Sequence, residues 1–161
     1  MNIYVASSWR NQYQPEVVRL LRDEGFEVFD FRHNDAIFHW REIDPFWKFW
    51  THEQCEIMLT QDEPEKAFAA DFGALQKADA AVMVMPCGRS AHLELGWLVG
   101  HGIPTAVYYE HDVPCDPELM IKMTDFRSTN IMDIIAFLKH QEQLEAHIDA
   151  RAEALYGEDK L

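Results

Sequence analysis

The pattern of apolar and polar positions along the chain predicts strands that alternate with helices. Short apolar runs rich in β-formers are typical of buried strands and cover residues 2–6, 26–31, 79–85 and 104–109, with a weaker run at 125–128. Helical patterns cover residues 15–25, 51–59, 63–78, 90–99 and 117–123, and a long helix follows from about residue 131. This alternation predicts an α/β three-layer sandwich, in which helices cover both faces of a parallel sheet in a flavodoxin-like or Rossmann-like arrangement.

Two segments depart from that pattern. Residues 32–52 form an insertion rich in tryptophan and phenylalanine. This insertion is either a satellite core or a lid whose rings, such as Trp40, stack on a planar base. From about residue 140 the chain is polar and acidic, which indicates a solvated helix. We expect residues 1–161 to form one domain.

The charge balance narrows the range of partners. The chain has 28 acidic and 14 basic residues, for a formal net charge of -14. This balance argues against nucleic acids and against anionic membrane surfaces, because both are bound by basic surfaces. A small anionic ligand is compatible with it, since a few arginines and backbone N–H groups outweigh the global sign locally.

The sequence predicts neither a metal nor a cofactor. The three cysteines, Cys55, Cys87 and Cys115, are widely spaced and form no CxxC pair, and the histidines form no ligand set. The first residues, MNIYVASSWRN, lack the apolar run of a secretory signal, and no run reaches the roughly 18 apolar residues of a membrane span. We therefore expect a cytoplasmic protein.

Ligands of such folds bind at the carboxyl ends of the strands, so the loops after residues 6, 31 and 85 are the expected site. Glu94 is a lone carboxylate on an apolar helix that follows the third of these loops, in PCGRSAHLELGW. Ser90 is the predicted N-cap, but a capping box needs Glu or Gln at position 93, which is Leu, so Glu94 is not explained as a cap. It either faces solvent or serves a pocket.

Further candidates surround this position. Asp71 is the only charge in AFAADFGALQ, and Tyr4 lies within the first predicted strand. Two loops offer groups that suit a phosphate or carboxylate: Ser7, Ser8 and Arg10 in one, and Gly88, Arg89 and Ser90 in the other.

The chain resembles the nucleoside 2-deoxyribosyltransferase superfamily, which includes the nucleoside 5'-monophosphate N-glycosidases. The matching segments are IYVASS, AADFGALQKADAAVMVMPCG and HLELGWLVGHGIPTAVYY. The resemblance implies a flavodoxin-like fold in a homodimer or higher homo-oligomer that acts on a nucleotide or nucleoside. It also implies that Glu94 is the nucleophile, that Tyr4 orients it, and that Asp71 positions the sugar or assists the leaving base.

One departure from the superfamily bears on the substrate. The transferases carry an acidic residue shortly before the nucleophile, whereas residues 80–93 contain no acid. This difference favours an N-glycosidase that cleaves the base from a nucleoside 5'-monophosphate. Three alternatives stay open: a deoxyribosyltransferase, an NAD hydrolase similar to TIR domains, and a non-catalytic sensor of a nucleotide-derived signal. The second is considered because the segment SAHLELGW also resembles the glutamate-bearing helix of TIR domains.

Overall fold

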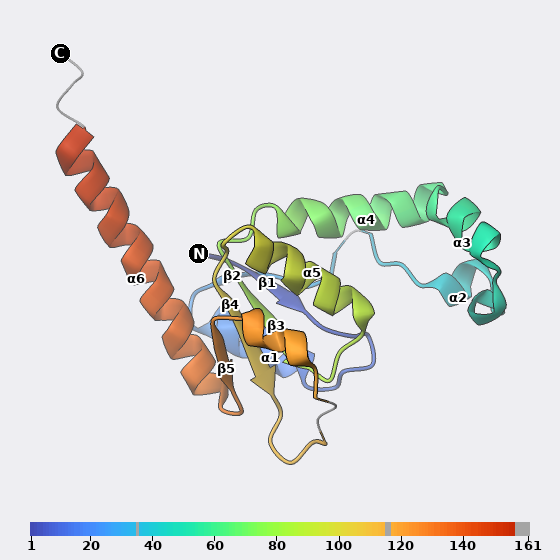
Figure 1. The fold of residues 1–161 in the computed structure, drawn as a ribbon, viewed down its shortest axis with the longest axis horizontal. Coiled ribbons are helices and arrows are strands. Elements are labelled where there is room, and N and C mark those ends of the chain that lie inside the picture. Colours follow the sequence, from blue (N-terminus) through green and yellow to red (C-terminus); the bar gives the residue numbers. More distant parts are fainter. Residues whose placement is uncertain (35, 115–116, 157–161) are drawn as a thin grey trace.

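The computed structural model describes residues 1–34, 36–114 and 117–156 and contains a five-stranded parallel sheet (Figure 1). The strands are β1 (Asn2–Ala6), β2 (Glu27–Phe29), β3 (Ala80–Met85), β4 (Thr105–Tyr109) and β5 (Phe126–Ser128). Their order in the sheet is β2-β1-β3-β4-β5, and each strand pairs in parallel with its neighbours. The predicted α/β sandwich is thus confirmed, with a second strand shorter than the predicted 26–31.

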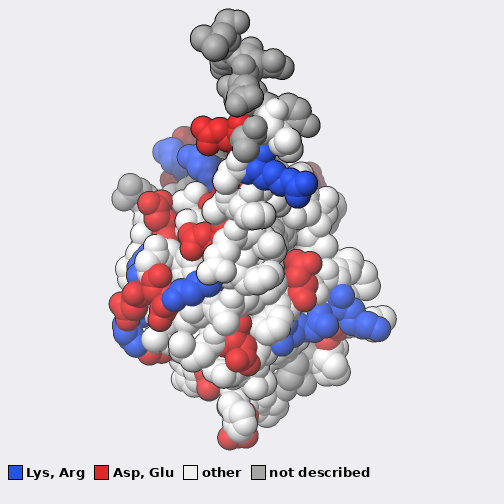
Figure 2. Space-filling model, turned by 90° about the vertical axis from the view of Figure 1, so that its left-hand side faces the viewer, with Lys and Arg blue, Asp and Glu red and all other residues white. Residues whose placement is uncertain are grey.

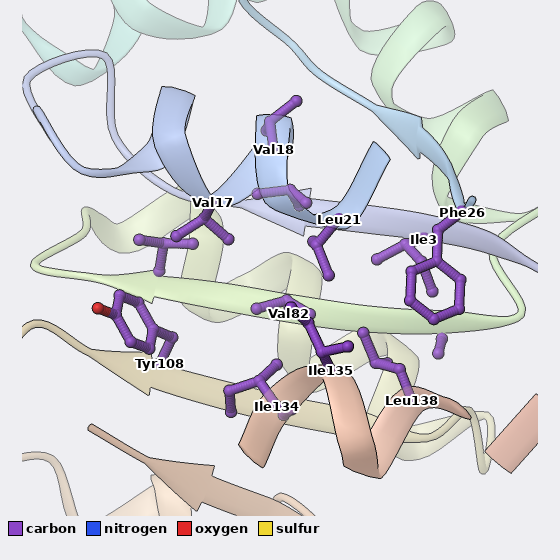
Figure 3. Packing of buried hydrophobic residues seen from close by; sticks show 14 residues of the cluster. Ile3, Val17, Val18, Leu21, Phe26, Val82, Tyr108, Ile134, Ile135 and Leu138 are labelled. Carbon is purple, nitrogen blue, oxygen red and sulfur yellow. The ribbon is translucent and has the colours of Figure 1, made fainter. Parts of the chain in front are cut away.

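Helices α1 (Gln14–Asp23) and α6 (Ile131–Tyr156) cover one face of the sheet. Figure 3 shows their apolar side chains packed on this face, where Leu21 and Leu138 meet Ile3 of β1 and Val82 of β3. Helix α1 ends before Gly25, whose φ of +92° suits glycine, so the predicted stop is confirmed.

Helix α5 (Arg89–Gly100) and the end of α4 (Asp62–Leu75) cover the opposite face. Because side chains alternate along a strand, Ile3 of β1 points to the α1 side and Tyr4 points to the α5 side. Tyr4 is only 1% exposed. The strand thereby delivers an aromatic hydroxyl to the layer that also holds α4 and α5.

The aromatic insertion leads into a projecting arm. It contains α2 (Trp40–Ile43), the 3-10 helix η1 (Trp47–Phe49) and then α3 (His52–Leu59), which a capping box of Thr51 and Gln54 begins. Figure 1 shows α2 and α3 beyond the amino end of α4, away from the sheet. Phe49, at the end of η1, is 82% exposed.

Only the first part of helix α6 packs against the sheet. Its first turns pack on β4 and β5, whereas its later turns project beyond the sheet (Figure 1). Leu144 and Ile148 on the projecting part are exposed, and acidic and basic side chains are interspersed over the face shown in Figure 2. The predicted helical tail is therefore present as far as the described chain extends, and residues 157–161 lie outside it.

The remaining element is η2 (Leu119–Met123), a 3-10 helix where the sequence predicts a short helix. Cys55 and Cys87 are free thiols, and Cys115 lies outside the described residues. Within residues 1–34, 36–114 and 117–156, no three His, Cys, Asp or Glu side chains are grouped to hold a metal ion. None of the helices in these ranges is long and apolar enough to cross a membrane.

Candidate active site

Tyr4, Asp71 and Glu94 come together from three elements that are far apart in the sequence. The hydroxyl of Tyr4 in β1 donates a hydrogen bond to the carboxylate of Glu94 in α5. Asp71 of α4 lies close enough for its charge to act on both groups. The structure thus groups the three residues that the sequence singles out as catalytic, and their roles remain predictions.

Packing fixes Tyr4 in this position. Its ring stacks on Phe29 of β2, with ring centroids 5.3 Å apart and planes inclined by 16°. Burial, followed by the negative charges of Glu94 and Asp71, raises the pKa of the Tyr4 hydroxyl far above its usual range. Tyr4 is therefore a permanent hydrogen-bond donor to Glu94 and has no role as a base near neutral pH.

Glu94 lies in a partly buried and negatively charged environment. Its helix buries Ala91, Leu95 and Leu98 against the sheet, and Glu94 itself is half-buried. Burial and then the charge of Asp71 raise the pKa of Glu94 to about 7, while the hydrogen bond from Tyr4 lowers it. Glu94 thus exchanges its proton near neutral pH, which is common for carboxyl groups at catalytic sites.

Asp71 is the second carboxyl group with a raised pKa. Burial raises the pKa of Asp71 to about 6, and a hydrogen bond from Asn34 lowers it. The Nδ2 group of Asn34 lies 3.3 Å from Oδ1 of Asp71. Between the pKa values of Asp71 and Glu94 the pair carries about one proton. Because the pKa of Glu94 is the higher, the form with the proton on Asp71 and the charge on Glu94 is the minor one.

Two further residues belong to this neighbourhood. Asn34 follows β2 at the carboxyl edge of the sheet, and this location was the only sequence signal for it. Cys87 lies just after β3, and burial followed by the charge of Glu94 raises the pKa of its thiol to about 12. Cys87 thus stays protonated near neutral pH, which argues against a thiolate nucleophile.

The loop after β1 is tied to the end of β3. Ser7 donates from Oγ to the carbonyl of Val84 at 2.9 Å, and Asn11 donates from Nδ2 to the carbonyls of Val84 and Pro86 at 3.0 Å. The guanidinium of Arg32 donates to three carbonyls of this loop, those of Ser8, Trp9 and Asn11. Two of the predicted ligand-binding loops are therefore adjacent and fixed.

The two arginines predicted to bind a phosphate, one on each loop, are exposed to solvent. Arg10 is exposed, and its backbone N–H donates to Oγ of Ser8 at 3.3 Å. Arg89 and Ser90 are exposed at the amino end of α5. Binding of a phosphate by these two arginines and by the first N–H groups of α5 remains a prediction.

The prediction that Ser90 caps α5 is wrong. The N-cap is Gly88, whose extended backbone has φ of -100° and ψ of -175°, and the helix begins at Arg89. Ser90 consequently lies inside the first turn. Its hydroxyl does not cap the helix, since Gly88 takes the N-cap position without a side-chain hydrogen bond.

Trp40 lies in a separate aromatic cluster. Its ring packs edge to face on Phe38, with centroids 4.7 Å apart, and on Trp50, with centroids 5.4 Å apart. Figure 1 shows α2 well away from α5 and β1. None of the residues of α2, η1 and α3 is buried, so the satellite core and substrate stacking on Trp40 both remain predictions.

Comparisons with known proteins place the fold but not the family. No protein-family model matches the sequence, and no curated protein matches it significantly. Solved structures do match. A 2-deoxyribosyltransferase from Bacillus psychrosaccharolyticus aligns with a TM-score of 0.57 and 21% identity over 83% of this chain and 90% of its own.

Two other structures give similar alignments. A conserved protein from Enterococcus faecalis V583 has a TM-score of 0.56 and 15% identity over 88% of this chain and 98% of its own. A CMP N-glycosidase from Clostridium botulinum has a TM-score of 0.50 and 12% identity over 86% of this chain and 99% of its own. The expected fold is thereby confirmed: the chain folds like deoxyribosyltransferase and nucleotide N-glycosidase structures, although identities this low establish the fold alone.

Proposed function

We propose that this protein is an N-glycosidase that cleaves the base–sugar bond of a nucleoside 5'-monophosphate, with Glu94 as the nucleophile. The observation that carries the proposal is the hydrogen bond from the buried Tyr4 to the half-buried Glu94, with Asp71 beside it. A carboxylate held by a neutral donor and accompanied by a second carboxyl group matches the chemical needs of glycoside cleavage. The matched 2-deoxyribosyltransferase and CMP N-glycosidase structures support the same class of reaction.

In the first step the ionised carboxylate of Glu94 attacks the anomeric carbon of the sugar. A glycosyl ester bond forms to Glu94, and the bond from that carbon to the base nitrogen breaks with its electron pair on the base. Asp71 supplies a proton to the leaving base, so the reactive form has the proton on Asp71 and the charge on Glu94. This form is a minor one, because the pKa is about 6 for Asp71 and about 7 for Glu94. Tyr4 keeps the attacking oxygen in position throughout.

In the second step water opens the ester. Asp71, now a carboxylate, takes a proton from the water as its oxygen attacks the anomeric carbon, and the carboxylate of Glu94 leaves. The products are the free base and a sugar 5-phosphate. If another base attacked in place of water, the same residues would perform a transferase reaction.

The preference for a 5'-monophosphate rests on the two fixed loops. Ser8 and Arg10 follow β1, and Gly88, Arg89 and Ser90 begin α5 next to them. The amino end of a helix offers unpaired N–H groups and a favourable dipole for an anion, and arginine adds charge-assisted hydrogen bonds. The lack of acidic side chains in residues 80–93 removes a source of repulsion.

One panel of substrates separates this proposal from its alternatives. The full chain is incubated with nucleosides, nucleoside 5'-monophosphates, NAD, and a nucleoside plus a second base, and chromatography measures free and exchanged bases. We expect base release from a monophosphate. Exchange between bases would favour the transferase, nicotinamide release would favour the NAD hydrolase, and tight binding without turnover would favour the sensor.

A further inference from the structure

We infer that Asn34 is a positioning residue that holds the carboxyl group of Asp71 in place for its part in base release. Its side chain joins the loop after β2 to helix α4 through the 3.3 Å contact from Nδ2 to Oδ1 of Asp71. Because Asp71 has a catalytic role only in the proposed reaction, the inference rests on the proposed function.

The orientation of the Asn34 amide follows from its second hydrogen bond. The backbone N–H of Ala36 donates to Oδ1 of Asn34 at 2.9 Å, which identifies that atom as the amide oxygen. The NH2 group must then face Asp71 and can only donate to it. The hydrogen bond from Ala36 thus sets the amide, and the amide sets the carboxyl group.

The surroundings of Asp71, apart from the Nδ2 group of Asn34, make Asp71 harder to ionise. Glu94 and Tyr4 lie near Asp71 from α5 and β1, and neither is a cation. Asp71 is half-buried. The hydrogen bond from Asn34 favours the charged form and lowers the pKa of Asp71 against the effect of burial. Loss of the donor should therefore raise that pKa.

A second asparagine provides a matched control. Asn130 accepts the N–H of Met132 on Oδ1 at 3.0 Å and donates from Nδ2 to Oδ1 of Asp133 at 3.3 Å. This is the same arrangement as at Asn34, but it is exposed at the start of α6. Substitution of Asn130 tests whether the motif matters in general or only beside Asp71.

The experiment measures the pKa of Asp71 by carbon-13 NMR titration of its side-chain carboxyl group and, in parallel, kcat and KM for base release. Asn34→Ala removes both hydrogen bonds. Asn34→Asp keeps the acceptor for Ala36 but loses the donor and adds negative charge. We expect Asn34→Ala to raise the pKa of Asp71 by roughly half a unit to one unit and Asn34→Asp to raise it more. We expect kcat to fall about tenfold in both with a smaller change in KM, and Asn130→Asp to match the wild type.

The outcomes separate this inference from the proposed function. An unchanged pKa of Asp71 in both Asn34 variants would overturn the positioning role. A changed pKa in Asn34→Ala alone would also overturn it, because the effect would then come from the loop and not from the lost donor. Base release by the wild type together with either of these results would leave the proposed function intact. The expected order of pKa values without base release by the wild type would support the contact between Asn34 and Asp71 and reject the proposed function.

Discussion

The hydroxyl of Tyr4 donates a hydrogen bond to the carboxylate of Glu94 between β1 and α5, where Tyr4 is buried and Glu94 is half-buried. The bond stabilises the ionised form of Glu94, whereas burial and the charge of Asp71 oppose ionisation. Together, Glu94 and Asp71 retain a proton into the range where isolated carboxyl groups have lost theirs.

The rate of base release should depend on pH as a bell. The active form of the pair carries one proton, on Asp71, and one negative charge, on Glu94. Since the pKa values are about 6 for Asp71 and about 7 for Glu94, this is the minor of the two singly protonated forms. The population of both singly protonated forms is highest between these values, so the rate should peak there and fall on either side. A profile of kcat against pH that is flat from 5 to 8, or that rises only near pH 4, would contradict the assignment of this pair.

Tyr4→Phe should shift the optimum to higher pH and lower kcat. The substitution removes the hydrogen bond that lowers the pKa of Glu94, so the carboxylate forms only at higher pH. It keeps the ring that stacks on Phe29, so folding should be preserved. We expect kcat to fall more than KM rises, because the lost interaction acts mainly in the transition state. A rise in KM alone would restrict Tyr4 to substrate binding.

Asp71→Asn should change the pKa of Glu94 in the opposite direction to Tyr4→Phe. Removing the charge of Asp71 lowers the pKa of Glu94 from about 7, so a single acidic limb should remain, at that lowered pKa. The alkaline limb should disappear, because no second carboxyl group loses a proton. We expect a loss of about 100-fold or more in kcat, the usual contribution of a general acid. Retention of the wild-type bell in Asp71→Asn would remove Asp71 from the protonation scheme.

A nucleoside 5'-monophosphate should be cleaved far better than its nucleoside. A charge-assisted hydrogen bond contributes roughly 1.5–3 kcal/mol, so Arg10→Ala and Arg89→Ala should each lower kcat/KM for the monophosphate by about 10- to 150-fold. Neither should affect the nucleoside, and Arg151→Ala, on the projecting part of α6, is the control. Equal rates on both substrates would reject the phosphate preference. A preference that survives both substitutions would reject only these two arginines.

The two parts of α6 should differ in their contribution to stability. Leu138 is fully buried against the sheet, whereas Leu144 is 44% exposed on the projecting part. Leu138→Ala should lower the free energy of unfolding by about 2–5 kcal/mol, and Leu144→Ala should change it by less than about 0.5 kcal/mol. Urea denaturation of the wild type and of both variants measures these changes in the free energy of unfolding. A large loss in Leu144→Ala would show that the projecting part is packed in solution.

The sequence predicted the sheet well because each strand has a distinct local pattern. The six apolar residues of β3, for example, are all buried, as a central parallel strand requires. Glu94 and Asp71 could be found for a similar reason, since each is an isolated charge on an otherwise apolar stretch.

Other parts of the site depend on contacts that no local pattern encodes. Asn34 reaches Asp71 across 37 positions of sequence, so its partner depended on how the loop after β2 approaches α4. Ser90 was mistaken for the N-cap because serine is common there, whereas Gly88 is the extended N-cap and the helix already begins at Arg89. The path of the aromatic insertion was equally unpredictable, since its rings pack on one another.

The most direct test of the central claim is the rate of base release from the preferred nucleoside 5'-monophosphate by the wild type and by Glu94→Gln. The substitution keeps the size of the side chain and removes its ability to form a glycosyl ester, while Glu56→Gln on exposed α3 serves as the control. We predict a loss worth several kcal/mol of transition-state stabilisation, about 1,000-fold or more, with unchanged folding and a wild-type rate in the control. Retention of more than about a tenth of the wild-type rate by Glu94→Gln, a loss of about 1.4 kcal/mol or less, would contradict the account.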